Sequence, residues 1–97
     1  MEALKLWERA KAIFILTLQS ETEKLQAERY FEMVTNVVMK ENHFIIFTIN
    51  KFASELMQKD YAEKLKSSFT LANAPTDLVI EFRYDISSRP SISINRQ

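Results

Sequence analysis

The stretch HFIIFTINKFASELMQKDYAEKL, His43 to Leu65, changes from one secondary-structure pattern to another across a single polar residue. The apolar run Phe44–Ile49 has the β-branched and aromatic composition of a strand. From residue 51 onward, apolar side chains recur at helical spacing, and no glycine or proline separates the two patterns. Asn50 is a favoured helix N-cap, because its side chain can accept from a backbone N–H two or three residues ahead. We therefore predict that a strand passes directly into a helix at Asn50.

Phe52 is the residue that this junction leaves to be explained. It falls in the first turn of the predicted helix, where a solvated residue is expected. One interpretation is ordinary core packing. The other is exposure, since a side chain in the first turn of a helix that leaves a sheet edge often projects past the core. In the second case, Asn50 would hold Phe52 on a rigid platform.

Two helices are predicted before this stretch. Apolar residues at helical spacing run from about Leu4 to Gln19 in two stripes. The stripes contain Leu4, Trp7, Phe14 and Leu18, and Leu6, Ala10, Ile13 and Leu16. Either both serve one wide core contact, or one packs inward and the other faces a partner. Ser20-Glu21-Thr22-Glu23 then matches a capping box and predicts a second helix to about Met33.

Strand patterns lie on both sides of the third helix. The β-rich runs Thr35–Lys40 and His43–Ile49 are joined by Glu41-Asn42, and an antiparallel hairpin is predicted because asparagine tolerates the positive φ of a tight turn. The third helix should end near Phe69, and Leu78–Tyr84 is predicted as a third strand. The order α-α-β-β-α-β predicts an α+β domain whose three-stranded sheet packs against helices.

The length and composition of the chain limit the kinds of protein to which it can belong. Ninety-seven residues make one domain, which is expected to span residues 1–85. Residues 86–97 lack a large apolar face, so they are expected to form a flexible tail or the start of a linker. Thirteen basic and thirteen acidic residues balance, which argues against strong nucleic-acid binding. The absence of glycine excludes a P-loop and a dinucleotide fingerprint. No apolar run approaches the roughly 18–20 residues of a membrane span, and no signal peptide is evident, so a cytoplasmic location is expected.

Several segments together resemble one family. They are Leu6-Trp7 in the first helix, the hairpin ending FIIFTINKF, the helix NKFASELMQKDYAEKL and the strand LVIEF. Over about residues 4–84 they look like the N-terminal domain of the bacterial chromosomal replication initiator DnaA. The resemblance implies a KH-like fold and a role in protein–protein contact. The implied partners are other initiator molecules, the replicative helicase and initiation regulators.

The resemblance also implies roles for particular residues. Trp7, with Leu6 beside it, matches the first-helix position that the family uses in self-association. Phe52, after Asn50, matches the phenylalanine that the family uses in helicase contact. An acidic residue near the start of the second helix also serves such contacts, and Glu21 or Glu23 could stand there. The family commonly has proline before the capping asparagine, where this chain has Ile49.

Catalysis and metal binding are not supported by the residues. His43 is the only histidine, the chain has no cysteine, and no carboxylate stands beside His43 at metal-ligand spacing. Glu21, Glu23 and their neighbours read as solvated or salt-bridged helix residues. No enzyme activity, metal or cofactor is therefore expected.

Weak binding of single-stranded nucleic acid is the alternative function. Lys51, Lys59 and Lys66 give the third helix a basic tendency, which Glu55, Asp60 and Glu63 offset. KH domains grip the nucleic-acid backbone with a GXXG loop, which a chain without glycine cannot build. The sequence leaves open whether the chain is a piece of an initiator or a stand-alone relative.

Overall fold

The structure is a computed structural model, and it describes residues 3–84. Its elements are α1 (Ala3–Thr17), α2 (Glu21–Glu32), β1 (Val34–Lys40), β2 (His43–Thr48), α3 (Lys51–Leu71) and β3 (Val79–Tyr84). The predicted α+β class and the order α-α-β-β-α-β are confirmed, with a three-stranded sheet packed against the helices. The tail predicted for residues 86–97 lies outside the described residues.

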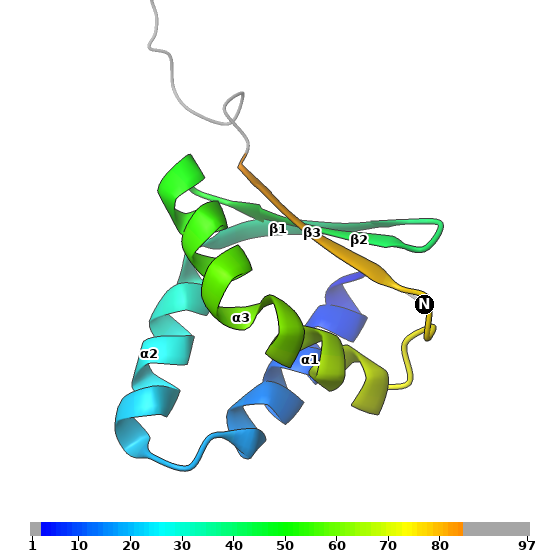
Figure 1. Ribbon diagram of the computed structural model, residues 1–97. Helices are drawn as coiled ribbons and strands as arrows, with labels where there is room; N and C mark the ends of the chain where they lie inside the picture. Colours follow the sequence, from blue (N-terminus) through cyan, green and yellow to red (C-terminus); the bar gives the residue numbers. More distant parts are fainter. Residues whose placement is uncertain (1–2, 85–97) are drawn as a thin grey trace, which may run out of the picture.

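The sheet has the order β1-β2-β3, with β2 in the middle. β1 and β2 form the predicted antiparallel hairpin, whereas β2 and β3 run parallel. Parallel neighbours need a long crossover connection, and α3 provides it. In Figure 1 the helices lie on one side of the sheet, and β3 crosses in front of the other two strands. The second face of the sheet is therefore left without a helix from the described residues.

Helix caps account for the boundaries of α2 and α3. Ser20 and Glu23 form the predicted capping box, in which the Glu23 N–H donates to Ser20 Oγ over 3.0 Å. At the end of α3, Asn73 takes a left-handed φ of 68°. The N–H groups of Asn73 and Ala74 donate to the carbonyls of Thr70 and Phe69 over 3.1 and 3.0 Å, which is a Schellman motif. In this glycine-free chain, asparagine occupies the position that glycine usually takes.

The hairpin turn differs from the prediction. Glu41, with a φ of 54°, adopts the positive φ that was expected to fall to asparagine. Asn42 makes tertiary contacts: its Nδ2 donates to the Asp77 carbonyl over 3.2 Å, and its carbonyl accepts from the Val79 N–H over 2.7 Å. These bonds fix the start of β3 beside the hairpin, so the asparagine is used for long-range connection.

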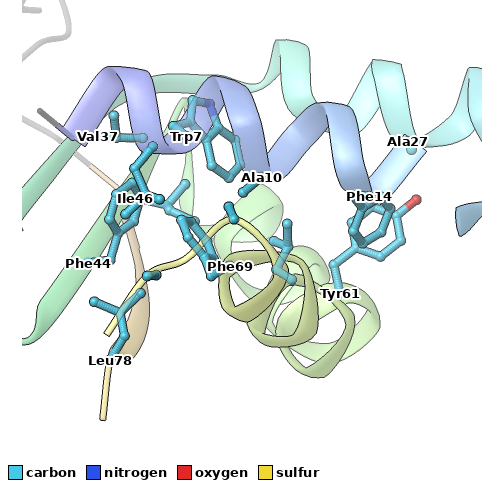
Figure 2. Packing of buried hydrophobic residues seen from close by; sticks show 14 residues of the cluster. Trp7, Ala10, Phe14, Ala27, Val37, Phe44, Ile46, Tyr61, Phe69 and Leu78 are labelled. Carbon is cyan, nitrogen blue, oxygen red and sulfur yellow. The ribbon is translucent and has the colours of Figure 1, made fainter. Parts of the chain in front are cut away.

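The core lies between α1, α3 and the inner face of the sheet. Figure 2 shows Trp7 pointing from α1 toward Phe69 and the sheet, and Phe14 lying against Tyr61. The Trp7 ring centroid is 5.5 Å from that of Phe31 and 6.3 Å from those of Phe44 and Phe69. The Phe14 centroid is 5.4 Å from that of Phe31 and 4.9 Å from that of Tyr61. These aromatic contacts join all three helices to β2.

The buried face of α1 draws on both predicted stripes. Its buried residues are Leu6, Trp7, Ala10 and Phe14. Leu4 and Leu16 are exposed, at 58% and 82%. The first alternative, one wide core contact, therefore holds for most of both stripes, since Ile13 and Leu18 also pack against the core and only Leu4 and Leu16 remain outside it.

Candidate protein-interaction site at the strand-to-helix junction

Asn50 joins β2 to α3 in the predicted way. Its backbone is extended, with φ −161° and ψ 174°, and its side-chain Oδ1 accepts from the Ala53 N–H over 2.8 Å. Only Ile49 and Asn50 separate the last residue of β2 from the first of α3. The prediction of a capped, loop-free junction is confirmed.

The hydroxyl groups of two buried side chains, Thr48 and Ser54, stabilise this junction. Thr48 Oγ1 lies 2.8 Å from Ser54 Oγ and 2.8 Å from the Asn50 carbonyl, and both side chains are buried. The same oxygen lies 3.3 Å from the Arg83 carbonyl on β3. The end of β2, the first turn of α3 and the end of β3 are thus connected through one side chain. Buried polar groups that satisfy one another in this way hold a single geometry.

Phe52 is exposed at this junction. Its side chain is 68% accessible, and that of Ile49, just before the cap, is 49% accessible. In many helices an apolar residue before the N-cap packs against the fourth helical residue. Here that residue is the buried Ser54, so Ile49 has no such partner and stays at the surface. The junction therefore presents two apolar side chains on an ordered backbone, and only Phe52 was singled out from the sequence.

Replacing Asn50 by alanine is expected to reduce the free energy of unfolding by about 1 kcal/mol, since an N–H of the first turn of α3 loses its side-chain acceptor. Urea unfolding followed by circular dichroism measures the change. Asn50→Asp is the matched variant, because aspartate caps a helix as well as asparagine does. Equal losses in the two variants would show that the cap is not the cause.

The two acidic candidates do not share a surface with Phe52. Glu21 and Glu23 are exposed at the start of α2. Glu23 lines a hollow with Asp60 and Lys64 of α3. At about 1.5 Å per residue, these lie roughly 12–18 Å along the helix from Phe52. In Figure 1, α2 and α3 begin at opposite ends of the molecule. One small contact cannot include both Phe52 and the start of α2.

Trp7 and Leu6 are core residues. Trp7 is 3% accessible and Leu6 is fully buried. The sequence left core and interface open for Trp7, and the resemblance favoured the interface, an expectation that the structure corrects. The physical reason is the aromatic environment on three sides, from α2, β2 and α3. Any self-association through α1 must use other side chains.

The three lysines of the alternative function lie along the part of α3 that runs beside β3. Lys51 and Lys59 line the same groove, where Lys51 Nζ is 3.9 Å from Glu55 Oε2. Lys66 donates a hydrogen bond to the Leu78 carbonyl, immediately before β3. The Lys66 ammonium group is therefore already hydrogen-bonded within the protein, and the Glu55 carboxylate interrupts the positive charge that Lys51 and Lys59 provide.

His43 is part of a group of hydrogen-bonded polar and charged side chains on the sheet. Its Nδ1 lies 2.8 Å from Glu81 Oε1, and Arg83 donates to Glu81 Oε2 over 2.9 Å. The hydrogen bonds from Arg83 and His43 hold the pKa of Glu81 below its usual value. Within residues 3–84 no cluster of three or more potential metal ligands is present. The sequence showed no carboxylate beside His43, because Glu81 is 38 residues away along the chain and only the pairing of β2 with β3 brings the two together.

Comparison with protein-family models, with curated proteins and with solved structures gives no match. Among the described residues, none of the helices combines the length and the apolar character that crossing a membrane requires.

Proposed function

We propose that this chain is a protein–protein interaction domain of a bacterial DNA replication initiator. In this role it binds the replicative helicase and initiation regulators at the origin, and it contributes to self-association of the initiator. The observation that carries the proposal is the pair of exposed apolar side chains, Phe52 and Ile49, at the capped junction. Exposed aromatic residues on an ordered backbone are typical anchors of small interfaces.

The rigidity of the junction supports the same proposal. A phenylalanine that is already held in place loses little conformational freedom on binding, so more of the contact energy appears as affinity. Asn50 and the Thr48–Ser54 hydroxyl pair provide this preorganisation. For self-association, α1 offers its exposed residues Leu4 and Leu16 in place of Trp7.

Phe52→Ala is expected to weaken binding to the N-terminal region of the replicative helicase at least tenfold. The melting temperature should stay nearly unchanged, because an exposed side chain contributes little to the core. An NMR titration of the isotopically labelled chain with the helicase fragment measures both affinity and site. Leu71→Ala is the matched control, since Leu71 is 65% accessible at the other end of α3.

Three results would count against the proposal. The helicase fragment could cause no shifts around residues 49–52, or Phe52→Ala could bind as well as the parent chain. A large fall in melting temperature for Phe52→Ala would instead assign Phe52 to the core. Binding that weakens equally in Leu71→Ala would indicate a diffuse contact without a Phe52 anchor.

A further inference from the structure

β3 has one edge that no other described strand occupies. It pairs with β2 alone. The Val79 N–H donates to the Asn42 carbonyl, and the Arg83 carbonyl accepts from Thr48, so both residues direct backbone groups toward β2. Successive residues of a strand direct their backbone groups to opposite edges. Ile80, Phe82 and Tyr84 therefore direct their N–H and C=O groups to the open edge.

A groove runs beside this open edge. It lies between the first half of α3 and the end of β3, and it has a volume of about 530 Å³. It is lined by Lys51, Ser54, Glu55, Gln58, Lys59, Phe82, Arg83 and Tyr84. Figure 1 shows β3 in front of the other strands, with α3 beneath it. Phe82 and Tyr84 are partly exposed and supply apolar surface next to the unpaired backbone groups.

The other edge of the sheet lacks these features. The pairing of β1 with β2 shifts register between Val34 and Asn36. This irregularity interrupts the row of backbone groups at the start of β1, where an added strand would need it to be regular. None of the principal hollows of residues 3–84 is lined by β1. The β3 edge is therefore the better template for a further strand.

We propose that the β3 edge and its groove bind an extended acidic peptide segment of a partner protein, which adds to the sheet as a fourth strand. Backbone hydrogen bonds to Ile80, Phe82 and Tyr84 supply affinity in this binding mode, and side-chain contacts supply specificity. The lining contains the cations Lys51, Lys59 and Arg83 and the carboxylate Glu55. Because Arg83 is paired with Glu81, Lys51 and Lys59 remain against Glu55, an excess of one positive charge. Side chains along an added strand alternate between the two faces of the sheet. The peptide residues on the helix side lie over Phe82 within reach of Lys51 and Lys59 and are acidic, and the residues between them are apolar and face the other side of the sheet.

A peptide fits these features better than single-stranded nucleic acid does. An extended peptide carries N–H and C=O groups that pair with those of the open edge as in a sheet, whereas the sugar–phosphate backbone of a nucleic acid carries no N–H donor. The groove lining does not include Phe52, so this contact is separate from the proposed helicase anchor and the two can be lost independently.

The test uses the full 97-residue chain and a capped octapeptide of alternating aspartate and valine. In an NMR titration, the amides of Ile80, Phe82 and Tyr84 should shift and their hydrogen exchange should slow at least tenfold. Two N-methylated versions, methylated at the valines or at the aspartates, block the two edges of the peptide in turn. At least one of them should bind tenfold or more weakly.

Variants on α3 test the groove. Lys59→Glu should weaken peptide binding at least fivefold, while Lys64→Glu, which alters an exposed lysine outside the groove, should change it less than twofold. Phe52→Ala should leave peptide binding intact, which separates failure of this proposal from failure of the helicase proposal. A matching peptide with lysine in place of aspartate should bind at least fivefold more weakly.

Four outcomes would overturn the inference. The first is the absence of shifts at millimolar peptide, and the second is equal binding by both methylated peptides. The third is a thymidine oligonucleotide that shifts the groove residues while the peptide does not, which would assign the groove to nucleic acid. The fourth is strong exchange protection of Ile80, Phe82 and Tyr84 in the free chain, which would mean that the edge is already paired.

Discussion

Trp7→Ala is expected to reduce the free energy of unfolding by about 3–5 kcal/mol, the range for truncating a large buried aromatic residue. The Trp7 side chain is 3% accessible and contacts aromatic rings from α2, β2 and α3, so the cavity cannot close by movement of one element. For a domain of this size the melting temperature should fall by more than about 12 °C. Thermal and urea unfolding followed by far-UV circular dichroism measure the loss.

Leu4→Ala on the same helix is the control for this experiment. Leu4 is exposed, and its removal should change stability by less than about 0.5 kcal/mol. A similarly small loss in Trp7→Ala would mean that the tryptophan is not packed in the core. The result also matters for studies of self-association. Loss of a dimer in Trp7→Ala does not by itself place Trp7 in the interface, because unfolding of the domain also removes the dimer.

Phe14→Ala should also cost about 3–5 kcal/mol, with a distinctive local effect on α2. Ala27 is the one fully buried residue of α2, so that helix is attached mainly through Tyr30 and Phe31. Phe31 packs edge-on against Phe14 at 5.4 Å, and Tyr30 lies 4.9 Å from Tyr61, which Phe14 also contacts. Removal of the Phe14 ring should therefore free α2 first, and hydrogen exchange should accelerate most at its amides.

The matched variant for this prediction is Leu25→Ala. Leu25 is an exposed residue of α2, so its loss should leave exchange in α2 nearly unchanged. Exchange that accelerates equally in α2, α3 and the sheet of Phe14→Ala would contradict the local effect. It would instead show that the domain opens only as one unit.

Local patterns in the sequence were sufficient to predict the six helices and strands and the N-caps of α2 and α3. Ser20 and Asn50 could be identified because capping depends on residues within one helical turn. The same reasoning predicted the hairpin correctly but assigned its positive φ to asparagine, whereas Glu41 adopts it. Asn42 is engaged with Asp77 and Val79, residues far away in the sequence, and a local rule has no access to such contacts.

The site was harder to predict because accessibility is a tertiary property. Phe52 and Trp7 are both aromatic residues near the start of a helix, yet one is exposed and the other buried. Their neighbours in sequence do not distinguish them; the packing of α1 against α3 and the sheet does. The groove beside β3 was not foreseen for the same reason, since it exists only after β3 pairs in parallel with β2.

The strand order also has a consequence for how the chain folds. β1 and β2 are neighbours in sequence and can pair as a hairpin within microseconds, whereas β3 must wait for the crossover through α3. Until β3 arrives, the second edge of β2, with its run HFIIFT, is open to strands of other chains. Because Asn50 caps α3 directly after β2, the crossover helix can start to form without the ordering of a loop between them. The glycine-free junction thus bears on the order in which the elements form as well as on the exposure of Phe52.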